Sequence, residues 1–172
     1  MKYNYKSIYN QNATFFERRP LLKKALIIFN QYVACFFVLA YGLLWLYGIT
    51  DGKFGAKDFL KIFCVPALAF IIVSAMRYMI DRPRPFAQNG AGITPLKKKQ
   101  NSSNSFPSRH VTCAAVIAMS FLPYIPAVSA LLFLLTMALG YSRFTLGWHY
   151  PSDLLAGLAL GLFIGLGMYL PI

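Results

Sequence analysis

Long runs of apolar residues, separated by short polar segments, dominate the hydropathy pattern of the chain. Residues 25–50 hold no Asp, Glu, Lys or Arg, and at about 1.5 Å per residue a helix of this length crosses the apolar core of a bilayer. Residues 62–76 form a shorter uncharged run, which extends to a predicted span over 57–80 because long basic side chains at its ends can reach the interface. Pro83 and Pro85 then end this helix, since proline lacks the amide hydrogen that a helix needs.

The second half of the chain predicts three more spans. No Asp, Glu, Lys or Arg occurs from His110 to Ser142, and one helix over that length would reach roughly 50 Å, well beyond the apolar core of a bilayer. Pro123 and Pro126 divide the run into two antiparallel helices joined by a short turn. The last apolar run carries glycine at positions 157, 161 and 165, a spacing that lets another helix pack closely against it. The five expected spans are about 25–50, 57–80, 108–122, 127–146 and 152–172.

These elements predict an all-α integral membrane bundle that forms a single domain over residues 1–172. The first 24 residues mix aromatic and basic side chains, which is typical of an amphipathic helix at the membrane interface. A disordered tail is the alternative for this segment, and we favour the helix. Residues 86–106 form a polar loop between the second and third spans.

The composition points to the bilayer as the solvent of this chain. Hydrophobic residues make up 58% and charged residues 13%, with a mean hydropathy of +0.53, which is more apolar surface than a soluble domain of this size can cover. The net charge of +12 indicates contact with anionic lipid headgroups rather than with nucleic acid, because the lysines form no nucleic-acid reading motif. Cys35, Cys64 and Cys113 lie singly in apolar runs, so we expect core residues and neither disulfides nor metal ligands.

The alternating order of the spans collects charged residues at one face of the membrane. The end of the second span, the start of the third, the end of the fourth and the start of the fifth all fall on the same side. These ends carry Arg77, Arg82, Arg84, Ser108, Arg109, His110, Ser142, Arg143, His149 and Asp153. Taken singly, each is typical of a helix end at the interface. Together they include both histidines of the chain, and ionisable groups gathered at the mouth of a membrane bundle indicate a functional site.

The residue types at this face are those that phosphate chemistry needs. Arginines offer planar forks of donors to a phosphate, and Ser108 with the first amides of the following helix can add further donors. Asp153 stands four residues after His149, so its carboxylate can orient the imidazole as a nucleophile or general base. His110 remains as a general acid for the leaving oxygen. No cluster of carboxylates is available for Mg²⁺, so we expect no metal and no other cofactor, with the arginines neutralising the charge instead.

Three stretches of the chain resemble the motifs of the type 2 phosphatidic acid phosphatase (PAP2) superfamily. The family patterns are K-x6-R-P, P-S-G-H and S-R-x5-H-x3-D. The chain has "RYMIDRPRP" at 77–85, "PSRH" at 107–110 and "SRFTLGWHYPSD" at 142–153. Arg77 replaces the lysine of the first motif and Arg109 the glycine of the second, whereas the third motif matches throughout.

The resemblance implies a mechanism without metal and a role for each matching residue. His149 would attack phosphorus and form a phosphohistidine, Asp153 would orient it, and His110 would protonate the leaving group. The same resemblance assigns phosphate binding to Arg77, Arg84, Ser108 and Arg143. Arg109 adds a charge beyond the family pattern, and we include it in the phosphate-binding set. Arg82 lies outside the motif and is left out of that set.

Small bacterial members of the family suggest a lipid substrate, with undecaprenyl pyrophosphate first. Phosphatidylglycerophosphate, phosphatidic acid and lipid A 1-phosphate are the alternatives. A non-catalytic lipid-phosphate binder or transporter is a hypothesis of another class, and the intact pair of His149 and Asp153 argues against it. The lysines and arginines on the site's side favour the cytoplasm by the positive-inside rule, whereas the resemblance favours the outer face, which we prefer. The sequence predicts no oligomeric state.

Overall fold

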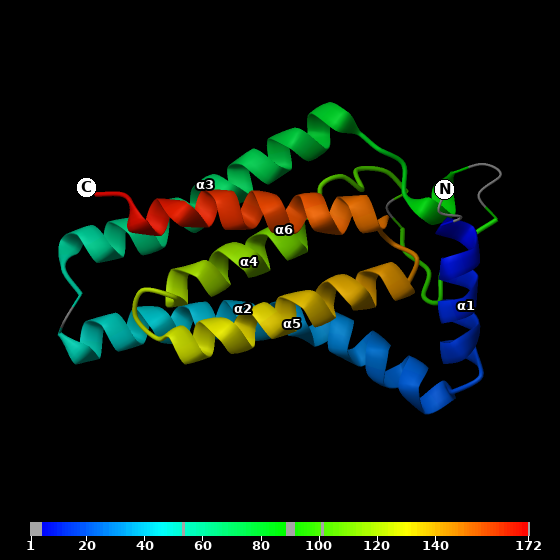
Figure 1. Cartoon of the computed structure of the whole chain (residues 1–172), viewed down its shortest axis with the longest axis horizontal. Coiled ribbons are helices and arrows are strands. Elements are labelled where there is room, and N and C mark those ends of the chain that lie inside the picture. Colours follow the sequence, from blue (N-terminus) through cyan, green and yellow to red (C-terminus); the bar gives the residue numbers. More distant parts are fainter. Residues whose placement is uncertain (1–4, 53, 89–91, 101, 172) are drawn as a thin grey trace.

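A bundle of membrane-length helices surrounds one short central helix in the computed structural model, which describes residues 5–52, 54–88, 92–100 and 102–171 (Figure 1). The α-helices are α1 Tyr5–Glu17, α2 Pro20–Asp51, α3 Ala56–Ile80, α4 Arg109–Phe121, α5 Pro126–Thr145 and α6 Pro151–Gly165. Two short 3₁₀ helices, η1 Pro85–Ala87 and η2 Leu166–Tyr169, complete the set. No strand occurs in the described ranges, so the prediction of an all-α bundle is confirmed.

Proline begins three of the helices, and the predicted break at Pro126 is one of these starts. Pro20, Pro126 and Pro151 stand at the first positions of α2, α5 and α6, where the missing amide hydrogen costs no helical hydrogen bond. The predicted ends agree with the observed ones to within a residue or two for the second, third and fourth spans. The last span begins as predicted, but α6 ends at Gly165 and continues only as η2 to Tyr169. The first span differs, because α2 begins at Pro20 rather than near residue 25 and includes Lys23 and Lys24.

Helix α4 is the exception among the five predicted spans. Helices α2, α3, α5 and α6 are long and apolar enough to cross a membrane, which makes the chain a multi-pass membrane protein. With 13 residues, α4 reaches only about 20 Å, which is less than the apolar core of a bilayer. It contacts α2, α3, α5 and α6, and nine of its residues are buried. Other helices, rather than lipid, therefore surround α4. The first turn of α4 can hold polar groups below the surface of the bundle.

The predicted packing role of the glycine stripe is confirmed at the contact between α4 and α6. A Cβ atom at Gly161 would lie 2.7 Å from both the Cβ of Ala115 and the carbonyl oxygen of Thr112. A Cβ atom at Gly157 would lie 2.8 Å from the carbonyl oxygen of Ser108. The missing side chains let the two helices approach closely, and this fixes the start of α4 against the start of α6.

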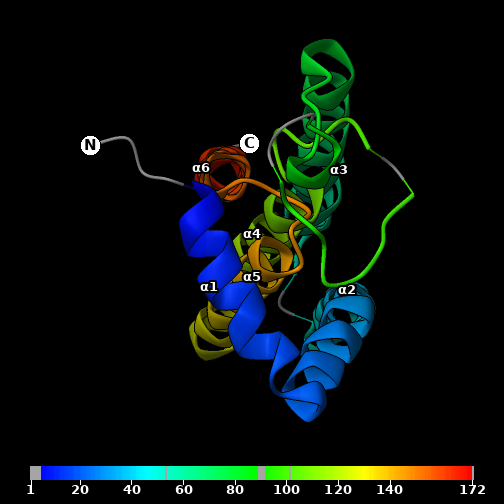
Figure 2. The same ribbon diagram turned by 90° about the vertical axis from the view of Figure 1, so that its right-hand side faces the viewer.

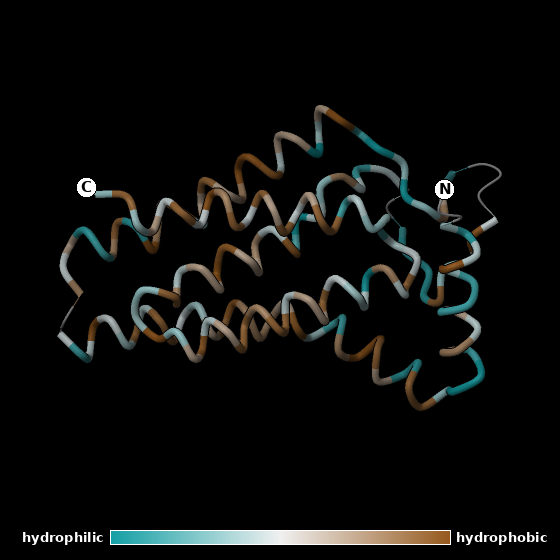
Figure 3. Tube along the Cα trace, viewed as in Figure 1, coloured by the Kyte–Doolittle hydropathy of each residue, from teal (hydrophilic) through white to brown (hydrophobic). Residues whose placement is uncertain are grey.

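The N-terminal segment forms a helix, which confirms the prediction of a helix over the alternative of a disordered tail. Helix α1 runs across the end of the bundle, in the region where the hydrophilic residues gather (Figures 1, 2 and 3). Its buried residues Tyr9, Ala13 and Phe16 pack against Leu146 and Trp148 in the turn between α5 and α6. Helix α1 therefore covers one side of the polar end of the bundle.

Candidate active site

A polar cavity of about 190 Å³ lies at the end of the bundle where the sequence places the charged residues. Its walls come from the end of α3, the segment that follows it, the start of α4, the end of α5 and the turn before α6. The lining residues are Arg77, Arg84, Lys99, Arg109, His110, Arg143 and His149. Six of the eight residues predicted for the site are among them, and Ser108 and Asp153 are fully buried beside it.

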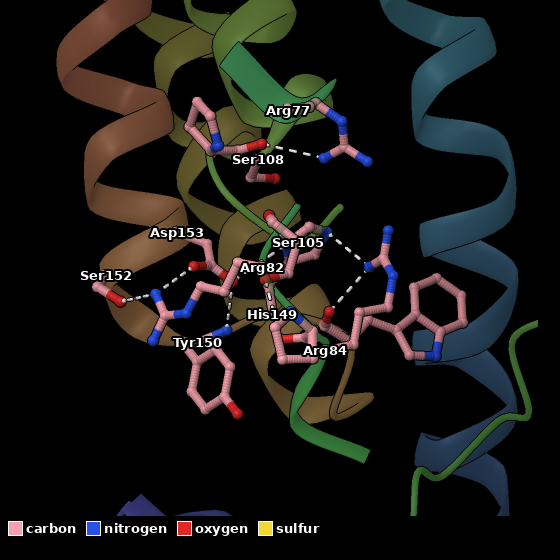
Figure 4. A network of polar contacts seen from close by, with 12 residues as sticks. Arg77, Arg82, Arg84, Ser105, Ser108, His149, Tyr150, Ser152 and Asp153 are labelled. Carbon is pink, nitrogen blue, oxygen red and sulfur yellow. Dashed lines mark hydrogen bonds and ion pairs between the residues drawn. The ribbon is translucent and has the colours of Figure 1, made fainter. Parts of the chain in front are cut away.

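His149 is fixed at the cavity by hydrogen bonds on both ring nitrogens (Figure 4). Its Nδ1 lies 2.9 Å from the carbonyl oxygen of Ser105, and its Nε2 lies 3.2 Å from Nη1 of Arg84. A carbonyl oxygen can only accept, so we assign the ring proton to Nδ1, and the lone pair of Nε2 accepts from Arg84. The nitrogen that faces the arginines is thus the nucleophilic one.

The imidazole of His149 is neutral at physiological pH. Its side chain is 2% exposed, and this burial lowers the pKa of His149 to about 3, with the charges of Arg84 and Arg143 acting in the same direction. The Asp153 carboxylate opposes the shift without cancelling it. A neutral ring keeps its lone pair, which is the form that attack on phosphorus requires.

Asp153 is held by more partners than the sequence suggests. Its Oδ2 accepts a hydrogen bond of 2.9 Å from the amide of Tyr150, which also caps α6, and lies 3.5 Å from Nδ1 of His149. The contact of the imidazole with the Ser105 carbonyl is shorter than its contact with Asp153. The carboxylate therefore flanks the imidazole and stabilises a positive charge on it, while Ser105 shares the task of orienting the ring.

Arg82, which is not in the predicted phosphate-binding set, is the charged partner of Asp153. Its Nη1 donates to Oδ1 of Asp153 at 2.8 Å and to Oγ of Ser152 at 2.9 Å. The guanidinium carbon also lies 4.2 Å from the ring centroid of Tyr150. Arg82 stands two residues before the arginine of the first motif and is one of the charged residues that the predicted topology collects at this face, but neither signal indicated a contact with Asp153.

Arg84 and Arg143 form a buried cationic wall with unused donors. They are 2% and 3% exposed, and Arg84 donates to the carbonyl oxygen of Trp148 at 2.9 Å. Within the described part of the chain, Nε of Arg84, Nε and Nη1 of Arg143 and Oγ of Ser108 have no hydrogen-bond partner. Buried donors without partners are costly unless a ligand satisfies them. The arrangement is suited to an anion with several acceptor oxygens.

Arg109 and His110, in the first turn of α4, connect the polar cavity with an apolar one. Both line the polar cavity and also a second cavity of about 330 Å³, whose other walls include Phe37, Phe70 and Cys113. The remaining lining residues of the second cavity are Ala34, Val38, Ala114, Ile117 and Leu139. A charged headgroup and an apolar chain attached to it could therefore contact adjoining sites.

The residues of the polar cavity are unsuited to a metal cation. No group of three or more His, Cys, Asp or Glu side chains that could ligate a metal occurs among the residues that the structure describes. The cavity walls are cationic, and the one buried carboxylate beside them, on Asp153, is already paired with Arg82. Anion binding is the chemistry that this donor set supports.

Comparison with known proteins identifies the family. The model of the PAP2 superfamily matches residues 58–171, which include all three motifs. The chain belongs to the PAP2 superfamily. The match begins in α3, so α1 and α2 lie outside the part of the chain that defines the family.

Relatives of this PAP2 chain include named phosphatases. YbjG of Escherichia coli (strain K12), provisionally named as an undecaprenyl-diphosphatase, is 32% identical over 121 residues, which are 70% of this chain and 58% of that protein. Undecaprenyl-diphosphatase BcrC of Bacillus subtilis (strain 168) is 26% identical over 84% of this chain and 72% of its own length. The chain thus spans little more than half of the first relative. The crystal structure of Aquifex aeolicus LpxE has a TM-score of 0.72 and 25% identity, covering 95% of this chain and 93% of that one.

Proposed function

We propose that the protein hydrolyses a membrane lipid phosphate or diphosphate without a metal, through a phosphohistidine on Nε2 of His149. The observation that carries this proposal is the setting of that nitrogen. Nε2 faces a small cavity in which Arg84 and Arg143 are buried with N–H groups that have no hydrogen-bond partner among the described residues. The proton on Nδ1 of the same ring is donated to the carbonyl oxygen of Ser105. The names of the relatives, which are phosphatases of lipid substrates, support the same class of reaction.

The residues allow a balanced two-step reaction. Burial and the neighbouring cations lower the pKa of His110 to about 2 in the free site, so we assign its proton to the substrate complex, where the negative charge of the bound phosphate favours the charged imidazole. In the first step Nε2 of His149 bonds to phosphorus, the bond from phosphorus to the leaving oxygen breaks, and His110, protonated in that complex, gives the oxygen its proton. In the second step water attacks the phosphohistidine, neutral His110 takes the proton of the water, and inorganic phosphate leaves. The arginines hold the phosphoryl oxygens throughout. Asp153 stabilises the positive charge that His149 carries while it is phosphorylated.

Undecaprenyl diphosphate is the substrate that we favour. The two relatives described above are named for that activity, and the apolar cavity next to Arg109 and His110 can receive the start of a hydrocarbon chain. Phosphatidylglycerophosphate, phosphatidic acid and lipid A 1-phosphate remain the alternative substrates. A panel of these lipids, each at the same mole fraction in detergent micelles, ranks them by the rate of phosphate release.

His149→Ala tests the mechanism. The variant should lose release of phosphate from every lipid of the panel, because it removes the imidazole that Ser105 and Asp153 orient at the cavity. Lys98→Gln, at an exposed position of the adjacent loop, is the matched control and should keep the parental rate. Retained phosphate release by His149→Ala would refute the proposal. Binding of lipid phosphate with no turnover by the unchanged protein would favour the binder or transporter.

We further propose that the site faces the outside of the cell membrane. Lys98 is exposed on the loop beside the cavity, so Lys98→Cys reports the side of the site. The three native cysteines, Cys35, Cys64 and Cys113, are first replaced by serine or alanine. Labelling of intact cells by a membrane-impermeant maleimide supports the outer face, and labelling only after lysis places the site in the cytoplasm.

A further inference from the structure

Lys99 is a cation of the cavity that belongs to none of the three motifs. It lies on the loop between α3 and α4, yet it lines the polar cavity together with the arginines and both histidines. Its Nζ is 4.4 Å from the ring centroid of Trp148, and the guanidinium carbon of Arg143 is 5.9 Å from the same ring. The indole of Trp148 thus lies close to both the lysine of the loop and an arginine of α5.

The loop that carries Lys99 is anchored to the rest of the protein. Nε1 of Trp148 donates to the carbonyl oxygen of Lys97 at 2.9 Å, and the hydroxyl of Tyr9 donates to the carbonyl oxygen of Thr94 at 2.7 Å. Leu96 is buried in the cluster that joins α1 to the turn before α6. These contacts hold Lys99 at the cavity, whereas the neighbouring Lys98 is exposed.

The charge of the cavity exceeds what one phosphate needs. A phosphate monoester carries about −1.5 to −2 near neutral pH. The guanidinium groups of the four arginines at the cavity already outweigh that charge, and Lys99 adds another cation. Asp153 offsets only part of this positive charge, because it lies outside the cavity lining and pairs with Arg82. A second phosphate group supplies the further negative charge and the further acceptor oxygens that this set of donors can bind.

We propose that Lys99 binds the second phosphate of a diphosphate headgroup and thereby makes the site prefer diphosphate over monophosphate lipids. The inference rests on the hydrolase activity proposed above and adds to it the residue that selects the headgroup. Lys99 acts as a specificity residue here and takes no part in covalent catalysis. The three family motifs hold the phosphate that His149 attacks, and the anchored loop supplies the contact to the other one.

The ionisation of Lys99 provides a second measurable consequence, which is the pH dependence of its contact with phosphate. Burial lowers the pKa of Lys99 to about 7, and the nearby charges add to the shift. The charged or titratable groups that share the cavity are Arg77, Arg84, Arg109, Arg143, His110 and His149. Lys99 is charged below this pKa and neutral above it, so its contact with a phosphate weakens as the pH rises through about 7. An arginine at this position would stay charged over the whole range.

The test compares kcat/KM for a prenyl diphosphate and for the prenyl monophosphate with the same chain. Lys99→Gln should lower the ratio of the two values by about 10- to 100-fold, the range expected for one charge-assisted hydrogen bond. Lys98→Gln removes the same formal charge from the exposed neighbour and should leave the ratio unchanged. Lys99→Arg should keep the ratio at pH 7 and remove its decline at higher pH.

Two results would overturn the assignment of Lys99. One is an unchanged ratio in Lys99→Gln, and the other is an equal loss on both substrates, which would make Lys99 a general attractor of anions. Thermal-shift titrations with inorganic pyrophosphate and with phosphate repeat the comparison without turnover. If the unchanged protein hydrolyses neither prenyl lipid nor any other lipid of the panel, the proposed function fails. The Lys99 inference then stands if Lys99→Gln selectively weakens pyrophosphate binding, and falls if it does not.

Discussion

Replacing Arg82 with alanine tests whether the ion pair behind the nucleophile contributes to catalysis. The change removes the 2.8 Å contact between Nη1 of Arg82 and Oδ1 of Asp153, while the Tyr150 amide still donates to Oδ2. Asp153 is then a fully buried carboxylate with one oxygen unpaired. It can rotate or attract a proton, and either change weakens its stabilisation of a positive charge on His149.

The expected magnitude follows from the burial of the two partners. Removing one partner of a fully buried ion pair costs about 3–5 kcal/mol, which is the upper bound here. The Arg82 side chain is 35% exposed, so solvent screens part of the interaction. We therefore expect the loss of transition-state stabilisation to be about 1.5 kcal/mol, the value of one charged hydrogen bond. This loss corresponds to roughly a tenfold fall in kcat.

The assay measures kcat and KM for phosphate release from the best lipid of the panel. Arg82 is not among the described residues that line the cavity, so KM should change less than kcat. Ser152→Ala removes the hydrogen bond from Nη1 of Arg82 to Oγ of Ser152 and keeps the ion pair, so it serves as the control and should retain the parental kcat. An unchanged kcat in Arg82→Ala, or a rise in KM alone, would refute a positioning role for Arg82.

Three further predictions follow from the geometry. Gly161→Ala should lower the free energy of unfolding by about 1–3 kcal/mol, because the new Cβ would lie 2.7 Å from the Cβ of Ala115 and from a backbone oxygen. Gly42→Ala is the control and should not lower it, because its new Cβ would meet no neighbouring atom within 4 Å. Melting temperatures in detergent compare the two variants. A chelator such as EDTA should leave the rate of phosphate release unchanged, and a loss that added Mg²⁺ restores would contradict the metal-independent reaction. In a His110→Asn variant, the single remaining imidazole should show no titration by NMR between pH 5 and 8, because burial lowers the pKa of His149 to about 3 and protonation begins only near that value.

The sequence determined the helices and the end of the bundle at which the charged residues meet. Inside a bilayer every backbone amide and carbonyl must be bonded within the protein, so an apolar run of sufficient length has to be a helix. Prolines at 83, 123 and 126 then placed the breaks to within a few residues. Because successive helices alternate in direction, the two histidines and the arginines had to lie at one end, and the third motif indicated their chemistry. The Arg84–His149 contact spans 65 positions of sequence, yet both residues could be chosen in advance.

Only the tertiary structure decided which groups surround the nucleophile. The Ser105 carbonyl that binds Nδ1, the Arg82 that pairs with Asp153 and the Lys99 that lines the cavity all come from segments with no periodic pattern. The path of such a segment depends on contacts with distant residues, here Tyr9 and Trp148, which no local rule predicts. The length of the third span depended on tertiary structure in the same way, since α4 can be shorter than the bilayer only because four other helices enclose it. Local patterns therefore fixed the helices, and the packing of loops and side chains made the cavity.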